Sequence, residues 1–177
     1  MFNCGSSPYT LTLTSGKTIS KDTVIDGGNL VTLSGGNKVR ILSVQSFYNL
    51  STPSLTVQNL TFANGYTTDV PNTTSGSQGG AGIYKLGGTL NVINSRFINN
   101  VGPVTGQDVA GGAIYSIGGA PTTIVDSFFK ANQASNGGAI GVLGSGLTVV
   151  NSKLLGNTLQ QVMIVTPATA VTAVVSI

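Results

Sequence analysis

Apolar and polar residues alternate with a period of two in a segment that recurs four times along the chain. The copies begin at residues 55, 90, 122 and 147, and their starting points lie 25 to 35 residues apart. Alternation of this period is typical of β-strands, and repeats of about 20–50 residues are typical of stacked coils. We therefore predict a β-solenoid in which each coil contributes short strands that pair in parallel with the next coil, about 4.8 Å away.

Alignment of the four copies places side chains of one kind in columns. The predicted interior stacks are Val57, Val92, Ile124 and Val149, and Phe62, Phe97, Phe129 and Leu154. The predicted polar ladders are Asn59, Asn94, Asp126 and Asn151, and, at the closing position, Asn100, Asn132 and Asn157. Asparagine tolerates left-handed backbone angles and can hydrogen-bond the same side chain one coil away. We therefore interpret the polar columns as structural ladders at corners.

Three Gly-Gly-Ala sequences begin at residues 79, 111 and 137, and they predict tight corners. The distance from each first glycine to the following ladder residue is 15, 15 and 14 residues. The distance from the closing residue to the next glycine pair instead varies, at 14, 11 and 5 residues. We therefore expect residues 66–78 and 101–110 to form neighbouring loops on one side of the rod, where repeat folds often build a binding face. The candidate binding residues in these loops are Tyr66, Asp69, Gln107 and Asp108.

The chain divides into two segments. Residues 1–159 are predicted to form a parallel β-helix of about six or seven coils, and residues 160–177 a tail of Val, Ala, Thr and Ile without the repeat. Two roles for the tail remain open. It either covers the last coil as a terminal strand, or it pairs with another chain by strand addition or end-to-end stacking.

Composition limits the kinds of catalytic, metal and disulfide site that the chain can form. Only 7% of residues are charged, there is no histidine or glutamate, and Cys4 is the single cysteine. These absences exclude a histidine-based triad, an imidazole metal ligand and an intrachain disulfide. We assign no catalytic, metal or cofactor-binding residue and expect no cofactor.

Charge and hydropathy also limit the partners. The formal net charge of +3 comes without a cluster of Lys and Arg along the chain, so we do not expect nucleic-acid binding. No apolar run approaches the roughly 20 residues of a spanning helix, so we expect no membrane span. We recognise no signal peptide at the start of this sequence.

Several of these repeats resemble a known family. The sequences that carry the resemblance are Gly79-Gly80-Ala81, Gly111-Gly112-Ala113-Ile114-Tyr115, Gly137-Gly138-Ala139-Ile140, Phe97 to Asn100 and Phe129 to Asn132. They resemble the repeat of the polymorphic outer membrane proteins and related right-handed parallel β-helix proteins of bacterial surfaces. The copy at residues 154–157 departs by Leu for Phe, and the copy at 62–65 by Gly for Asn. The resemblance implies a right-handed parallel β-helix of the pectate-lyase-like fold and an extracellular or cell-surface location.

The favoured functional hypothesis is a non-enzymatic extracellular structural or adhesive module. Its expected partners are other copies of the chain or a cell-surface or polysaccharide ligand. The alternative is a polysaccharide lyase or hydrolase, because pectate lyases of similar fold use Ca²⁺ held by carboxylates with Arg or Lys as base. In that case Asp69 and Asp108 would share the cation, and Arg96 and Lys153 would lie in one column two coils apart. Ice binding has less support, because the Thr-x-Thr row at residues 10–14 does not repeat.

Overall fold

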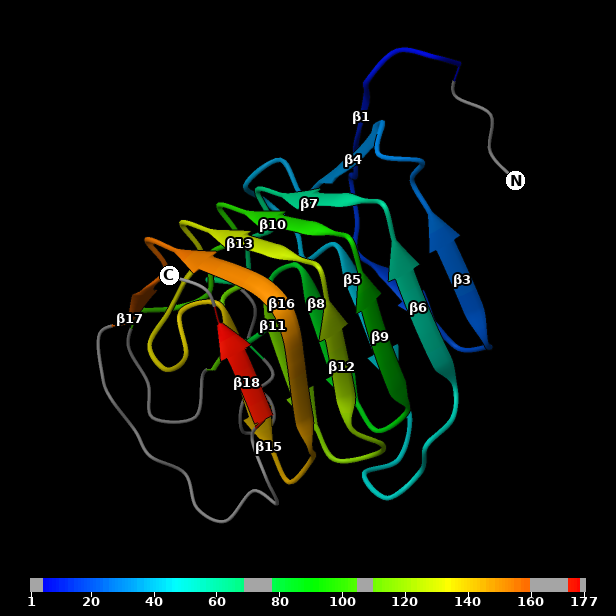
Figure 1. Cartoon of the computed structure of the whole chain (residues 1–177), viewed down its shortest axis with the longest axis vertical. Coiled ribbons are helices and arrows are strands. Elements are labelled where there is room, and N and C mark those ends of the chain that lie inside the picture. The colour runs from blue at the N-terminus through cyan, green and yellow to red at the C-terminus, as the bar shows by residue number, and fades with distance from the viewer. Residues whose placement is uncertain (1–4, 69–77, 105–109, 160–171, 176–177) are drawn as a thin grey trace.

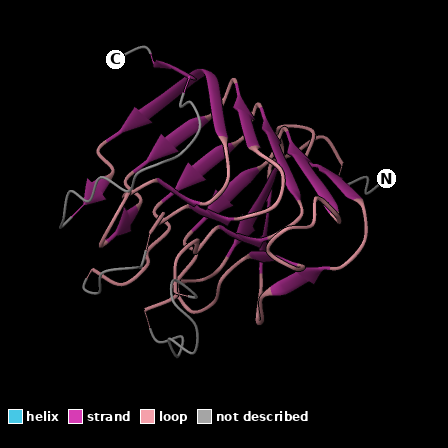
Figure 2. Cartoon of the chain, turned by 90° about the horizontal axis from the view of Figure 1, so that it is seen from below, coloured by secondary structure: helices cyan, strands magenta, loops and turns pink. Residues whose placement is uncertain are grey.

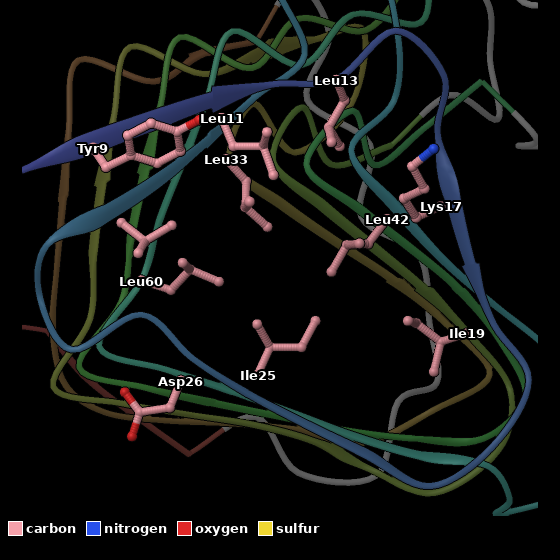
Figure 3. A pocket seen from close by; sticks show the side chains of 11 residues that line it. Tyr9, Leu11, Leu13, Lys17, Ile19, Ile25, Asp26, Leu33, Leu42 and Leu60 are labelled. Atoms are coloured by element: carbon pink, nitrogen blue, oxygen red, sulfur yellow. The ribbon is translucent and has the colours of Figure 1, made fainter. Parts of the chain in front are cut away.

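The described chain is a right-handed parallel β-helix. The computed structural model describes residues 5–68, 78–104, 110–159 and 172–175, and these residues contain strands but no helix (Figures 1 and 2). Among them, no helix has the length and apolar character required to cross a bilayer. Figure 3 looks along the axis with the first coil nearest, and shows three walls around one interior. The chain runs clockwise while it recedes, which is the right-handed sense. The predicted fold class is confirmed.

Each coil passes through three walls in a fixed order. The first wall contains β1 (Tyr9–Thr12), β4 (Val31–Ser34), β7 (Thr61–Ala63), β10 (Arg96–Ile98), β13 (Phe128–Lys130) and the second half of β16 (Leu147–Leu155). The second wall contains β2 (Lys17–Ile19), β5 (Leu42–Gln45), β8 (Ile83–Leu86), β11 (Ile114–Ile117) and β15 (Ile140–Leu143). The third wall contains β3 (Thr23–Asp26), β6 (Ser54–Gln58), β9 (Thr89–Ile93), β12 (Thr122–Val125), the first half of β16, and β18 (Thr172–Val175).

The walls give six strand levels in the first and third walls and five in the second, within the described residues. β16 is long enough to pass through a corner, and it therefore joins the first and third walls into one sheet. The short strands β14 (Gln133–Ala134) and β17 (Thr158–Leu159) pair separately. About six coils are thus present, at the lower end of the expected number.

The interior consists of side chains stacked at equivalent positions. Val57, Val92, Ile124 and Val149 are in register and buried. Phe62, Phe97 and Phe129 are also in register and buried, and their rings stack with centroids 4.7 and 4.8 Å apart and interplanar angles of 7° and 4°. Leu154 continues the phenylalanine column in register, but it is 37% exposed because it lies on the last level of the first wall. It therefore differs from the predicted interior position.

Two corners have left-handed backbone angles at repeated positions. Between the third and first walls the residues are Asn59, Asn94, Asp126 and Asn151, with φ from 43° to 53°. After the first wall they are Asn64, Asn99, Ala131 and Gly156, with φ from 53° to 58°. Asparagine and aspartate accept this conformation more readily than most residues, and the repeat uses them where the chain must turn.

The glycine motifs align differently from the sequence prediction. Gly80, Gly111 and Gly137 share a positive φ of 63°, 66° and 54°. Each lies three residues before one of the paired residues Ile83, Ile114 and Ile140. The strand register therefore aligns residues 80–82, rather than residues 79–81, with the Gly-Gly-Ala sequence at 111–113. Gly82 takes the place of Ala113. The spacing to the ladder becomes 14, 15 and 14 residues.

Loop length also varies at more than one corner. Between the second and third walls, β8 and β9 are joined by the two residues Gly87 and Gly88, whereas β5 and β6 are joined by residues 46–53. Length variation is therefore not confined to the corner that contains residues 66–78 and 101–110, as the constant spacing from the glycine pairs to the ladder had suggested. Of the tail, the structure describes β18, which pairs in parallel with β16 and extends the third wall by one level.

Candidate functional site

The N-terminal end of the helix presents an open apolar interior. β1, β2 and β3 each lie at the edge of their sheet, with no strand on the outer side within the described residues. A cavity of about 460 Å³ opens there, as seen along the axis in Figure 3. The side chains that line it are Tyr9, Leu11, Leu13, Lys17, Ile19, Ile25, Asp26, Val31, Leu33, Leu42 and Leu60. All but Lys17 and Asp26 are apolar or aromatic, so this end exposes a core to solvent.

The same interior column is exposed at both ends. Leu11 begins the column that continues through Leu33 and the stacked phenylalanines to Leu154. Leu11 is 42% exposed and Leu154 is 37% exposed, whereas the three phenylalanines between them are fully buried. The two exposed ends therefore have matching positions and matching chemistry.

The first polar column forms an exposed ladder in two sections. Asn94 Nδ2 donates to Asn59 Oδ1 (2.8 Å), and Asn59 Nδ2 donates to Asp26 Oδ1 (3.1 Å). Asn151 Nδ2 donates separately to Asp126 Oδ1. The pKa of Asp26 lies below its usual value, first because Gln58 donates to it, and then because of the Gly28 N–H and Asn59. These side chains satisfy one another at a corner.

The second polar column forms a buried ladder. Asn132 Oδ1 accepts from the backbone N–H of Asn100 (3.0 Å) and from its Nδ2 (2.9 Å). Asn132 Nδ2 donates to Asn157 Oδ1 (2.8 Å) and to the carbonyl oxygen of Phe97 (3.0 Å). Asn132 therefore uses all its amide donors and both acceptor positions without water. Gly65, which lacks the side chain, donates its N–H to Asn100 Oδ1 (3.0 Å).

A serine row follows the exposed ladder and was not predicted. Ser127 Oγ accepts from the N–H of Ser95 (3.2 Å), and Ser152 Oγ accepts from the N–H of Ser127 (3.0 Å). The signal was available, because each of these serines directly follows a residue of the polar column. The row supplies hydrogen bonds between coils at the bend, where strand pairing is interrupted.

The predicted loop residues are only partly described. Tyr66 pairs with Val101 in a parallel bridge, and the N–H of Thr67 donates to the Val101 carbonyl (3.0 Å). The bases of the two loops are therefore side by side. Asp69, Gln107 and Asp108 lie outside the described residues.

Arg40 makes two kinds of contact on the outer side of the second wall, hydrogen bonds and a cation–π contact. Arg40 donates from Nε to the Gly80 carbonyl (3.1 Å) and from Nη2 to the Gly79 carbonyl (2.9 Å). Its guanidinium carbon lies 4.7 Å from the centroid of the Tyr84 ring, a cation–π distance. Burial lowers the pKa of Arg40 to about 10 and raises that of Tyr84. Arg40 thus links the corner at Gly79 and Gly80 to Tyr84 of the second wall.

Lys85 was also not identified as a candidate from the sequence. Alternation along β8 turns Ile83 and Lys85 to the interior, where Lys85 is 0% exposed. Its Nζ donates to Ser116 Oγ (3.1 Å) and to the carbonyl oxygens of Gly118 (2.6 Å) and Ala120 (2.9 Å). Desolvation lowers its pKa to about 8. The buried ammonium stabilises the turn between the second and third walls.

We expect the stability of the protein to rise with pH between about 8 and 9.5. In this range the unfolded chain keeps the Lys85 proton and the folded chain loses it, since the folded pKa of about 8 lies below the ordinary lysine pKa of 10.5. The slope should approach about 1.4 kcal/mol per pH unit. Urea denaturation at several pH values should show this rise in the wild type and its loss in Lys85→Met. Lys130→Met, at an exposed position, should keep it; an equal slope in Lys85→Met would contradict the assignment.

Residues 46–53, which we call the strap, cross several coils. The N–H of Gly88 donates to the Leu50 carbonyl (2.7 Å), and the N–H of Gly119 donates to the Tyr48 carbonyl (2.6 Å). The strap is therefore fixed to the third and fourth coils by main-chain bonds.

Glycines make room for the strap. A Cβ atom at Gly118 would meet the ring of Tyr48, and one at Gly144 would meet its hydroxyl oxygen. Phe47 at the tip is 78% exposed. The glycines at 87–88, 118–119 and 144 were the sequence signal for this contact, although the sequence alone does not show which loop covers them.

Among the described residues, no group of three or more Cys, Asp or Glu side chains lies together. The described carboxylates Asp22, Asp26 and Asp126 instead accept hydrogen bonds from Ser54, Gln58 and Asn151. Comparisons with protein-family models, with curated proteins and with solved structures found no match.

Proposed function

We propose that the chain is a non-enzymatic structural and adhesive module of an extracellular surface, which extends end to end by pairing between copies. The observation that carries the proposal is the interior column whose first and last members, Leu11 and Leu154, are both exposed. Burying these residues is favourable by roughly 25 cal/mol per Å² of apolar surface.

The arrangement favours head-to-tail stacking. In the first wall the last level is the second half of β16, which carries the same interior column as the level that would precede β1 in the next copy, and in the third wall the last described level is β18. Unpaired edge strands are templates for further pairing. A head-to-tail contact does not close on itself, so it generates an open filament rather than a dimer.

The test uses charges placed at the two ends. Leu11→Asp and Leu154→Asp, each alone, should assemble less than the wild type, since an apolar column cannot bury an unpaired carboxylate. Sedimentation over a range of concentrations measures the assembly. An equal mixture of the two variants should form dimers only, because each variant keeps one intact end.

Thr10→Asp is the matched control. Thr10 is adjacent to Leu11 but points outward on β1, so this variant should assemble like the wild type. Far-ultraviolet circular dichroism should show that all three variants are folded. A monomeric wild type at about 100 μM, or loss of assembly in Thr10→Asp equal to that in Leu11→Asp, would overturn the proposal.

A further inference from the structure

Three basic side chains gather on the outer face of the first wall, although they are far apart in sequence. Arg96 lies on β10, Lys130 on β13 and Lys153 on β16, and all three are exposed. With Phe128 of β13 they form what we call the basic face. The repeat alignment already places Arg96 and Lys153 in one column two coils apart, and the strand register adds Lys130 on the coil between them.

The strand register sets the spacing of the charges. Arg96 pairs with Phe128, and Phe128 pairs with Lys153, so the two cations lie two strands apart, with backbones separated by about 10 Å. Lys130 pairs with Leu155 in the neighbouring column and completes a triangle. The Arg96 guanidinium carbon lies 5.0 Å from the centroid of the Phe128 ring, so an aromatic surface lies between the charges.

The basic face has little opposing charge. The nearest described carboxylate in sequence is Asp126, at the preceding corner, and it accepts a hydrogen bond from Asn151. The other described carboxylates, Asp22 and Asp26, belong to the first coil. No salt bridge neutralises Arg96, Lys130 or Lys153 within the described residues.

We propose that the basic face binds an anionic polysaccharide. This inference deepens the proposed adhesive function, on which it rests, by naming the class of ligand. The face is formed by three adjacent parallel strands of one wall, so its charges lie along a line that fits an extended chain with carboxylate or sulfate groups along its length. The cations match those groups, and the Phe128 ring offers an apolar contact to the sugar rings between them. End-to-end assembly would repeat the face along the filament and increase avidity.

The experiment measures binding of dextran sulfate, with uncharged dextran of equal length as the control. Leu11→Asp serves as the background, so that the result does not depend on assembly. Binding of dextran sulfate should weaken as salt concentration rises. Complex formation releases counterions from the polymer into solution, and added salt opposes that release. Dextran should not bind.

Two double variants separate the basic face from net charge. Lys130→Gln with Lys153→Gln and Lys21→Gln with Lys38→Gln each lower the formal charge by two, and all four lysines are exposed. The first pair should weaken binding at least tenfold, whereas the second should change it less than threefold.

Each other outcome would overturn the proposal. Equal losses in both double variants would show that net charge alone attracts the polymer. Duplex DNA bound as tightly as dextran sulfate of matched charge would assign the face to polyanions in general. Absence of binding in the Leu11→Asp background, together with intact wild-type filaments, would contradict the polysaccharide proposal and leave the proposed end-to-end assembly standing.

Discussion

Replacing Phe97 with alanine should lower the free energy of unfolding by about 3–5 kcal/mol. The side chain is fully buried, and its ring is stacked between Phe62 and Phe129. Truncation would remove both ring contacts and leave a cavity that strands paired on either side cannot collapse to fill. Guanidinium denaturation followed by circular dichroism measures the loss.

Phe47→Ala is the control for this prediction. It makes the same chemical change at a ring that is 78% exposed, so it should shift the free energy of unfolding by less than about 0.5 kcal/mol. If the two variants were equally stable, the phenylalanine column would not be the packed core described above.

Replacing Asn132 with leucine should lower the free energy of unfolding by about 3 kcal/mol or more. Leucine has nearly the same volume, but it cannot accept from the N–H and Nδ2 of Asn100 or donate to the Phe97 carbonyl. Each buried group left without a partner costs about 1–3 kcal/mol. The same denaturation experiment measures this loss.

Asn91→Leu provides the comparison for Asn132→Leu. Asn91 lies on β9 and makes one weak side-chain contact, from Nδ2 to Thr56 Oγ1 at 3.4 Å. Its replacement should change the free energy of unfolding by less than about 0.5 kcal/mol. Equal costs for the two variants would mean that the buried hydrogen bonds of Asn132 add no more stability than the single weak contact of Asn91.

The ladder and the aromatic stack link consecutive coils along the axis. Each buried asparagine bonds to the coil on either side, and each phenylalanine packs on the ring of the adjacent coil. Toward the ends the phenylalanine column continues as leucine, through Leu33 and Leu11 in the first coils and Leu154 in the last level of the first wall, so a stacked copy would continue an apolar column. A module that extends end to end requires this kind of periodic interior.

The sequence by itself determined the repeat and most of its columns. Period-two alternation selects which side chains face inward, and the recurrence of the segment places them at equivalent positions. Val57, Val92, Ile124 and Val149 therefore align without knowledge of the structure, and so do the stacked phenylalanines. The left-handed conformation of Asn59 and Asn94 also follows from local chemistry, because asparagine tolerates a positive φ.

Tertiary structure decided features that depend on contacts between coils. The register of Ile83 with Ile114 moved the first glycine motif by one residue, since strand pairing rather than residue identity fixes the alignment. Alternation along β8 turns Lys85 inward, but the carbonyl oxygens of Gly118 and Ala120 in the following coil, which accept hydrogen bonds from its Nζ, are partners that no local pattern reveals. The repeat alignment placed Arg96 and Lys153 in one column, whereas the strand register and the side-chain positions added Lys130 and the contact of Arg96 with the Phe128 ring. Long-range pairing brings these residues together, and a linear sequence does not contain those distances.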